Sequence, residues 1–219
     1  MKKKVVVGIF AHPDDEAFGP SGTLAKFAKT KDVYLICVTD GNDVRNGISN
    51  LAQIRKRELL ESANILGVKK VFFLGFKDGD LANNLYHKVA SRIARILKLL
   101  RPDTLITFEL RGISGHIDHI FVSMVTTYVF ERLAFVKTLL YHAILKTKNA
   151  SPSDYFVYFP PGYPKSEIDR VVNVAPFWEQ KIRAIGAHHS QYKDAEEILT
   201  MLKKDPKEEY FLELKKKSF

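Results

Sequence analysis

The sequence has 219 residues, of which 46% are hydrophobic and 27% charged, and its formal net charge is +9. This composition is typical of a soluble globular domain, and no apolar run approaches the roughly 18 residues of a membrane span. The basic residues are scattered, with small clusters near the two ends and no interleaved aromatic residues, so neither a nucleic-acid partner nor membrane insertion is expected.

Apolar runs rich in β-branched residues alternate with longer segments of helical period. This alternation predicts a single α/β domain over residues 1–219, with a Rossmann-like, mostly parallel sheet and helices on both faces. The expected strands are residues 4–10, 33–39, 71–74, 104–108, 139–145, 168–172 and 210–214, the last at a sheet edge. The expected helices are residues 16–29, 50–66, 85–100, 116–132, 177–187 and 195–203.

The single cysteine, Cys37, lies in the second expected strand. No disulfide can therefore form within the chain, which predicts a buried Cys37 and a cytoplasmic location. The basic start followed by Val5, Val6 and Val7 resembles a secretory signal, but His12 interrupts the apolar run before any cleavage site. We interpret it as the first strand. The sequence does not indicate an oligomeric state, and a homo-oligomer is compatible with it.

Residues 146–167 are rich in Pro, Tyr, Lys and Ser, with Pro160-Pro161-Gly162 near their centre. Such a composition predicts a long loop, and long loops in compact domains commonly carry function. We expect this loop to form a lid or a rim of the substrate site.

The run Ala11-His12-Pro13-Asp14-Asp15-Glu16 follows the first expected strand. One histidine and three carboxylates beside a buried strand repel one another and lose hydration unless a positive charge lies among them. An ordinary helix N-terminus would need only one of these acids. A divalent metal ion is the simplest positive partner.

A second polar cluster, His116-Ile117-Asp118-His119, follows the fourth expected strand. Ligands of open α/β sheets bind beyond the carboxyl ends of the strands, so the two clusters are expected to face one site. Alone, a His-x-x-His pair is usually without function. Together, His12, Asp15 and His119 form a two-histidine, one-carboxylate set that leaves a metal position open for water, as in catalytic sites.

The other polar residues of the two clusters have the chemistry of a metal-dependent hydrolase. A bound metal makes hydroxide available near neutral pH. Asp14 is then free to act as general base, and His116 either polarises the substrate carbonyl or protonates the leaving group. Asp118 is expected to hold His116 in the required tautomer.

The run from Ala11 to Glu16 resembles the signature of the LmbE-like (PIG-L) family of zinc-dependent N-acetylglucosamine deacetylases. Five further segments resemble successive motifs of that family in the same order: Val38-Thr39-Asp40-Gly41, Ile54-Arg55-Lys56-Arg57-Glu58, Leu74-Gly75-Phe76-Lys77-Asp78-Gly79, Ser114-Gly115-His116-Ile117-Asp118-His119 and Ala187-His188-His189-Ser190-Gln191. The resemblance covers about residues 5–191 and implies an LmbE-like fold. It matches no motif in residues 146–167 or in the tail, where substrate selectivity commonly resides.

The resemblance implies that His12, Asp15 and His119 bind Zn2+ and that Asp14 is the general base. Only the resemblance separates the role of Asp14 from that of Asp15. Two histidines and a carboxylate also suit iron, cobalt or nickel, so another divalent transition metal is compatible with the residues.

The resemblance further implies that His116 stabilises the tetrahedral oxyanion with Asp118 behind it. Arg55 matches an arginine that helps to hold the sugar, and His188 is expected near the rim of the active site. The alternatives are an exposed helix pair for Arg55 and Glu58, and a helix cap or surface patch for His188.

The function predicted by this resemblance is removal of acetyl from an N-acetylglucosaminyl compound, releasing acetate and a free amine. The family implies chitooligosaccharides, a glucosaminyl conjugate of thiol synthesis, or an N-acetylglucosamine-bearing glycolipid or antibiotic. The basic balance favours an anionic conjugate. The alternatives are an amidase acting on a glucosaminyl thiol conjugate and a non-catalytic metal-binding or sugar-binding module.

Overall fold

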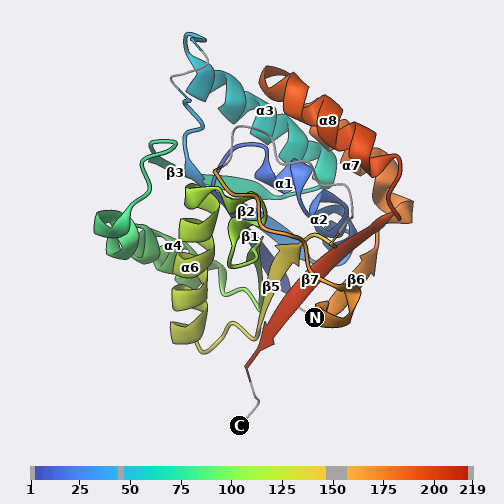
Figure 1. Ribbon diagram of the computed structural model, residues 1–219. Coiled ribbons are helices and arrows are strands. Elements are labelled where there is room, and N and C mark those ends of the chain that lie inside the picture. The colour runs from blue at the N-terminus through green and yellow to red at the C-terminus, as the bar shows by residue number, and fades with distance from the viewer. Residues whose placement is uncertain (1–2, 44–46, 147–156, 217–219) are drawn as a thin grey trace.

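The computed structural model describes residues 3–43, 47–146 and 157–216. Within these residues seven strands form one sheet in the order β3-β2-β1-β4-β5-β7-β6 (Figure 1). The strands are β1 Val5–Phe10, β2 Asp32–Thr39, β3 Lys70–Phe76, β4 Thr104–Phe108, β5 Thr138–Ala143, β6 Arg170–Asn173 and β7 Glu208–Lys215. Strands β1 to β5 pair in parallel, and β7 pairs antiparallel with both β5 and β6. The predicted mostly parallel α/β fold is confirmed.

The helices cover both faces of the sheet (Figure 1). One side carries α1 Asp15–Phe18, α2 Ser21–Ala28, α3 Leu51–Leu66, α7 Trp178–Gly186 and α8 Tyr192–Leu202. The other side carries α4 Tyr86–Leu100 and α6 Ile117–Arg132, preceded by the short turn α5 Gly112–Gly115. Short 3-10 helices are η2 Asn83–Leu85, η3 Lys165–Glu167, η4 Ala175–Phe177 and η5 His189–Gln191. No helix in the described part of the chain is both long and apolar enough to cross a bilayer.

The helix predicted over residues 16–29 is instead two helices, α1 and α2, so that prediction was wrong. Gly19 has φ −91° and ψ −117°, outside the helical region, and Pro20 is the N-cap of α2. A proline has no N–H to continue the hydrogen bonds of a preceding helix, which explains why α1 stops here.

The last predicted strand also differs from its expected position at a sheet edge. Strand β7 lies between β5 and β6, and its Phe211 is fully buried. The short strand β6 extends the sheet by antiparallel pairing and forms the edge. Of the loop predicted over residues 146–167, residues 147–156 lie outside the described part, and Tyr163 pairs with Leu145 after β5.

The pairing of β1 with β4 brings the two predicted polar clusters together. Val6 is in register with Thr104 and Gly8 with Ile106. The rings of Phe10 and Phe108, the last residues of these strands, are 5.4 Å apart. The loops that follow β1 and β4 therefore begin side by side. Cys37 is 2% exposed in the neighbouring strand β2, as predicted for a core residue.

A buried ion pair anchors the segment that follows β1. Glu209 of β7 accepts hydrogen bonds from the N–H groups of Gly22 and Thr23 at the start of α2. Lys181 of α7 donates to both Glu209 and the carbonyl of Gly19. Although burial raises the pKa of Glu209, Lys181 and these donors outweigh that effect and lower it. The end of α1 is thereby fixed to β7.

His142 of β5 makes the stability of the fold dependent on pH. Burial lowers the pKa of His142 to about 4, against the opposing effect of Glu209. Between pH 6.5 and 4 the unfolded chain binds a proton that the folded chain does not, so stability falls as the pH falls. Between pH 7.5 and 4.5, we expect the free energy of unfolding of wild type to fall by about 2–3 kcal/mol more than that of His142→Phe, as measured by urea unfolding. Equal losses would contradict this explanation.

Candidate active site

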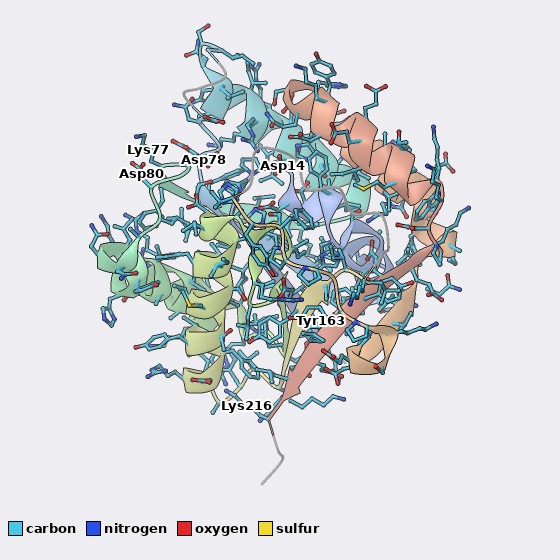
Figure 2. The ribbon with its side chains drawn as sticks, viewed as in Figure 1. Asp14, Lys77, Asp78, Asp80, Tyr163 and Lys216 are labelled. Atoms are coloured by element: carbon cyan, nitrogen blue, oxygen red, sulfur yellow. The ribbon has the colours of Figure 1, made fainter. Side chains whose placement is uncertain are left out.

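The polar residues singled out from the sequence gather at the carboxyl end of the parallel strands. Figure 2 shows Asp14, after β1, and Asp78, after β3, at the same end of the sheet, whereas Lys216, after the antiparallel β7, lies at the other end. In a parallel sheet the loops that follow the strands all lie at the carboxyl end of the sheet. Residues far apart in sequence therefore meet in one site.

The three residues predicted as metal ligands come together in the structure. His12 Nδ1 lies 3.1 Å from His119 Nε2 and 3.5 Å from Asp15 Oδ2. His119 Nε2 lies 3.2 Å from Asp15 Oδ1. His12 and Asp15 are less than 9% exposed, and the side chain of His119 is 14% exposed. Two ring nitrogens and a carboxylate thus face one small space.

The outer nitrogen of His12 contacts two carboxylates. Its Nε2 lies 3.1 Å from Asp78 Oδ1 and 3.3 Å from Asp118 Oδ2. The hydrogen bonds with Asp118, Asp15 and Asp78 raise the pKa of His12 well above its usual value, although burial lowers it. In the neutral ring, a proton on Nε2 shared with these carboxylates leaves the Nδ1 lone pair directed toward His119.

The outer nitrogen of His119 contacts a backbone carbonyl. Its Nδ1 lies 3.1 Å from the oxygen of Gly112, which can only accept a hydrogen bond, so Nδ1 carries the proton. The ring also stacks on Phe108 at a centroid distance of 4.1 Å. The lone pair of Nε2 is then directed at His12 Nδ1, and when both rings are neutral, two lone pairs 3.1 Å apart favour a cation between them.

Two groups in the described residues bring one ligand atom from each residue within 4.8 Å of one another: His12 with His116 and His119, and His12 with Asp78 and Asp118. His12 is common to both groups. Histidine and carboxylate side chains that could hold a metal ion are therefore present, and Nε2 of His12 faces Asp78 and Asp118 whereas its Nδ1 faces His119.

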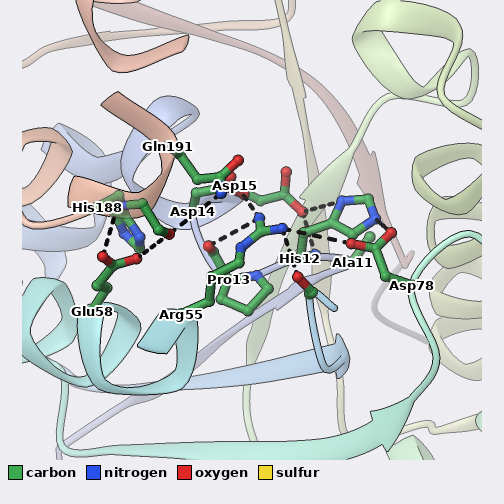
Figure 3. A network of polar contacts seen from close by, with 12 residues as sticks. Ala11, His12, Pro13, Asp14, Asp15, Arg55, Glu58, Asp78, His188 and Gln191 are labelled. Atoms are coloured by element: carbon green, nitrogen blue, oxygen red, sulfur yellow. Dashed lines mark hydrogen bonds and ion pairs between the residues drawn. The ribbon is translucent and has the colours of Figure 1, made fainter. Parts of the chain in front are cut away.

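Arg55 connects Asp14 to the loop after β2, and Figure 3 shows its side chain beside Pro13 and Asp14. Its Nη2 donates to Asp14 Oδ2 at 2.8 Å, and its Nη1 donates to the carbonyl of Gly41 at 3.0 Å. Gly41 has φ +68°, and a Cβ there would lie 2.7 Å from Pro13 Cδ, so only glycine fits at this approach. Arg55 is 4% exposed, which excludes the alternative of an exposed helix pair.

The two adjacent aspartates have different environments. Burial raises the pKa of Asp14 to about 6, although the charge of Arg55 opposes the increase. Asp15 is also buried, but the charge and hydrogen bond of His119 lower its pKa well below the usual value. Carboxyl groups with such separated pKa values commonly have different roles in catalysis.

His116 is the N-cap of α6, and its ring is in a defined neutral tautomer. Its Nδ1 accepts a hydrogen bond from the backbone N–H of Asp118 at 3.1 Å. Burial and the neighbouring His12 and His119 lower the pKa of His116 to about 4. Because Nδ1 is an acceptor, the ring proton lies on Nε2, which makes that nitrogen a donor.

Asp78 was matched to a family motif in the sequence but was given no role. It contacts Nε2 of His12, and its Oδ2 lies 3.6 Å from Arg55 Nη1. Its position directly after a parallel strand is the same signal that identified the other two clusters. Asp118 Oδ2 accepts from the N–H of Gly79 at 2.9 Å, in addition to its contact with His12.

His188 is buried, which excludes a surface patch, and although it is the N-cap residue of η5, its side chain makes no capping hydrogen bond. It is 1% exposed, and its Nε2 lies 2.8 Å from Glu16 Oε1, which also accepts from Ser62. Glu58 accepts from both the backbone and the hydroxyl of Ser190. Glu16 therefore has a structural partner beyond starting a helix, which the sequence did not indicate.

A cleft of about 800 Å³ opens beside the metal-binding group, within the range of about 300–1,000 Å³ that small-molecule sites span. Its lining includes Asp78, His116 and Asp118. Val157, Tyr158 and Pro160 also line it. The described end of the loop predicted as a rim thus lies at this cleft.

Comparison with known proteins identifies the family. The family model described as GlcNAc-PI de-N-acetylase, PIG-L, matches residues 7–130, more than half of the chain. The chain is 30% identical over 200 residues to a probable N-acetyl-alpha-D-glucosaminyl L-malate deacetylase 2 of Bacillus cereus, with 87% of this chain and 84% of the relative covered.

Two solved structures have the same fold. One is N,N'-diacetylchitobiose deacetylase from Pyrococcus horikoshii, with TM-score 0.72, 23% identity, and 97% of this chain and 84% of that chain covered. The other is a 4-carboxy-2-hydroxymuconate hydratase from Pseudomonas putida, with TM-score 0.72, 14% identity, and 99% and 98% covered. Because one of the two is a hydratase, the fold alone does not define the reaction. The sequence match does define the family: the chain belongs to the PIG-L (LmbE-like) family of N-deacetylases.

Proposed function

We propose that this chain is a metal-dependent N-deacetylase that converts an N-acetylglucosaminyl compound into acetate and a free amine. The observation that carries the proposal is the convergence of His12 Nδ1 and His119 Nε2, 3.1 Å apart, beside the Asp15 carboxylate. Membership of the family supports N-deacetylation as the reaction. The two histidines and the carboxylate support binding of the metal ion that this reaction requires.

We assign His12, Asp15 and His119 as the metal ligands. Two imidazoles and one carboxylate fit a divalent ion, and both imidazoles have their outer nitrogens occupied by other partners. Zn2+ is the proposed metal, because this ligand set is common in zinc hydrolases and the family signature is that of zinc enzymes. A bound divalent ion would lower the pKa of water near neutrality and polarise the amide carbonyl.

Asp14 is the proposed general base. Its carboxylate is held by Arg55 next to the proposed ligand Asp15 and has a pKa of about 6, high enough to accept a proton near neutral pH. As water attacks the amide carbon, Asp14 takes its proton and later delivers a proton to the departing amine. The C–N bond then breaks, and acetate and the amine are released.

His116 is the proposed oxyanion donor. Its Nδ1 accepts from the backbone of Asp118, so its Nε2 carries the proton that is donated to the oxygen gaining negative charge as water attacks. The Asp118 backbone thus fixes the tautomer of His116, whereas its carboxylate contacts His12. This differs from the prediction from the sequence, in which the Asp118 side chain held the tautomer of His116.

Arg55 and His188 remain predicted substrate-binding residues, with positioning roles added by the geometry. The guanidinium of Arg55 already holds Asp14 and the loop after β2, and His188 holds Glu16 next to the proposed ligand Asp15. Both side chains are almost completely buried. We therefore propose that each acts mainly by fixing the His12 to Glu16 loop.

The substrate is proposed to be a small N-acetylated amino sugar or glycoconjugate. The malate conjugate named for the Bacillus cereus relative and diacetylchitobiose named for the Pyrococcus horikoshii enzyme are the first candidates. Lys77 and Arg111 line the cleft together with several acidic residues, so the cleft itself has mixed charge. The single domain, the cytoplasmic location and a homo-oligomer remain predictions from the sequence.

We expect the purified protein to bind one metal ion per chain and to release acetate and amine in equal amounts. The assay is metal analysis combined with amine and acetate detection, using the malate conjugate, diacetylchitobiose and free N-acetylglucosamine. Removing the metal with a chelator should abolish release, and adding Zn2+ should restore it.

The same assay, with a glucosaminyl thiol conjugate added to the substrates, separates the alternatives. Amide cleavage of a glucosaminyl thiol conjugate without acetate release would identify the amidase. Bound metal without amine release from any of these compounds would identify a non-catalytic binding module.

A further inference from the structure

The carboxylate of Glu109, the residue that follows β4, is buried and surrounded by donors. Its Oε1 accepts from the N–H of Ile113 at 2.8 Å, and its Oε2 accepts from the N–H of Arg111 at 2.8 Å. The hydroxyl of Tyr163 and the Nε of Arg111 also donate to Oε2, at 2.8 and 3.3 Å. Glu109 is 2% exposed, so these bonds compensate for the lost hydration of its charge.

These bonds hold a strained loop. Ile113 has φ +63° and ψ −61°, a conformation that β-branched residues rarely adopt. Gly112 has φ +71°, and a Cβ on it would lie 2.9 Å from His119 Cβ. Strained backbone of this kind persists only where the surroundings determine it, and the Glu109 carboxylate binds the N–H of Ile113 itself.

The same loop orients a proposed metal ligand. The carbonyl of Gly112, which lies between the two N–H groups bound by Glu109, accepts from His119 Nδ1 at 3.1 Å. That contact determines which ring nitrogen of His119 faces His12 and Asp15. If Glu109 released Arg111 and Ile113, the Gly112 carbonyl would lose its fixed direction.

Tyr163 contacts Glu109 and follows, by three residues, Pro160 at the rim of the cleft. Its backbone exchanges hydrogen bonds with Ile144 and Lys146 after β5. Burial and Glu109 raise the pKa of Tyr163 to about 12, so its hydroxyl stays protonated as a donor. Arg111 stacks on its ring at 4.0 Å, and Figure 2 shows Tyr163 below the end of the sheet that carries Asp14. The rim residue Tyr158 packs against the same loop, since a Cβ on Gly115 would meet its carbonyl oxygen.

We propose that Glu109 is a positioning residue that orients His119 for metal binding through the Gly112 carbonyl and, through Tyr163, fixes the rim of the substrate cleft. This inference rests on the proposed metal site. It assigns two separable effects to one carboxylate, one on the metal through the N–H groups of Arg111 and Ile113 and one on the substrate through the hydroxyl of Tyr163.

The effect on the metal is tested with Glu109→Gln, whose amide group cannot accept from both Arg111 and Ile113. We expect about 10–100-fold weaker Zn2+ binding, measured by competition with a chelator, and an altered visible spectrum of the Co2+-loaded protein. Turnover should fall at saturating metal through kcat. The matched control is Glu131→Gln, an exposed glutamate on α6, which should change neither.

The effect on the substrate is tested with Tyr163→Phe, which removes one hydroxyl and keeps the ring under Arg111. We expect KM to rise about 3–10-fold, with Zn2+ affinity and the Co2+ spectrum within about twofold of wild type, as for loss of one hydrogen bond. If Zn2+ affinity falls as much in Tyr163→Phe as in Glu109→Gln, the effects on the metal and on the substrate are not separable and the proposal is overturned.

A failure to fold is distinguished from a loss of metal binding by a second variant. If Glu109→Gln does not fold, as judged by circular dichroism, Glu109→Asp keeps the charge and withdraws it by one methylene, and is expected to weaken Zn2+ binding at least about threefold. Wild-type Zn2+ affinity in either folded variant overturns the role of Glu109 and leaves the proposed function intact. If wild type itself binds no metal, the proposed function fails first.

Discussion

Replacing Asp14 by Asn is expected to reduce kcat about 1,000-fold while the protein retains one metal ion per chain. The carboxylate is the proposed general base, and such groups typically contribute about 10²–10⁴ in rate. The Asp14→Asn change keeps the size of the side chain and one oxygen for the hydrogen bond with Arg55, which lies 2.8 Å from Asp14 Oδ2. The measurement is amine release at saturating substrate, with metal content determined on the same sample.

Asp205→Asn is the matched control, because Asp205 is exposed in the turn after α8. It should have wild-type turnover. Thermal unfolding must accompany the assay, since Asp14→Asn leaves Arg55 buried beside a neutral group. Loss of the metal from folded Asp14→Asn would show that Asp14 is a ligand and would reverse the roles assigned to the two aspartates.

Replacing a proposed metal ligand is expected to remove the metal itself, which Asp14→Asn should retain. Asp15→Asn and His119→Ala should each weaken Zn2+ binding by more than about 100-fold, since loss of an outer-shell partner alone commonly costs about 10–100-fold. Turnover should fall below detection at stoichiometric metal. The measurement is Zn2+ competition with a chelator, followed by amine release at a fixed free Zn2+ concentration.

His87→Ala is the matched control for these variants. His87 is an exposed histidine of α4, and its removal should leave metal affinity and turnover unchanged. Wild-type affinity in His119→Ala would contradict the assignment of His119, and the group of His12, Asp78 and Asp118 would then become the candidate site.

The sequence predicted that the two polar clusters lie in one site, because the loops that follow parallel strands lie at the same end of the sheet. Two loops that follow paired strands, β1 and β4, were sufficient to bring His12 close to His119. The same rule applies to Asp78 after β3, although the sequence gave it no role. Its contact with His12 depends on the conformation of the loop after β3, which strand periodicity does not encode.

The environments of Arg55 and Glu109 could not be read from the sequence. Arg55 lies in a helix of high overall polarity, and only the packing of α3 beside the loops after β1 and β2 buries it. Glu109 accepts hydrogen bonds from its near neighbours Arg111 and Ile113, but Tyr163, which also donates to it, follows 54 residues later. Long-range packing decides both positions, whereas helix and strand periods are local.

Two errors in the fold have local and non-local causes. The break between α1 and α2 was marked by Gly19-Pro20, but the apolar residues on both sides continued the helical pattern across it. The interior position of β7 depends on the antiparallel addition of β6, which precedes it in the chain. The hydrophobic patterns of β6 and β7 do not indicate which strands pair with them.

The most direct test of this account is the position of the metal in crystals of the Zn2+-loaded protein, located by anomalous scattering at the zinc edge. We predict a single strong peak about 2.0–2.2 Å from His12 Nδ1, His119 Nε2 and an Asp15 oxygen. The two nitrogens of His12 make the test decisive, because Nε2 faces Asp78 and Asp118. A peak bound to His12 Nε2 and these two carboxylates, with none beside Asp15 and His119, would contradict the proposed site.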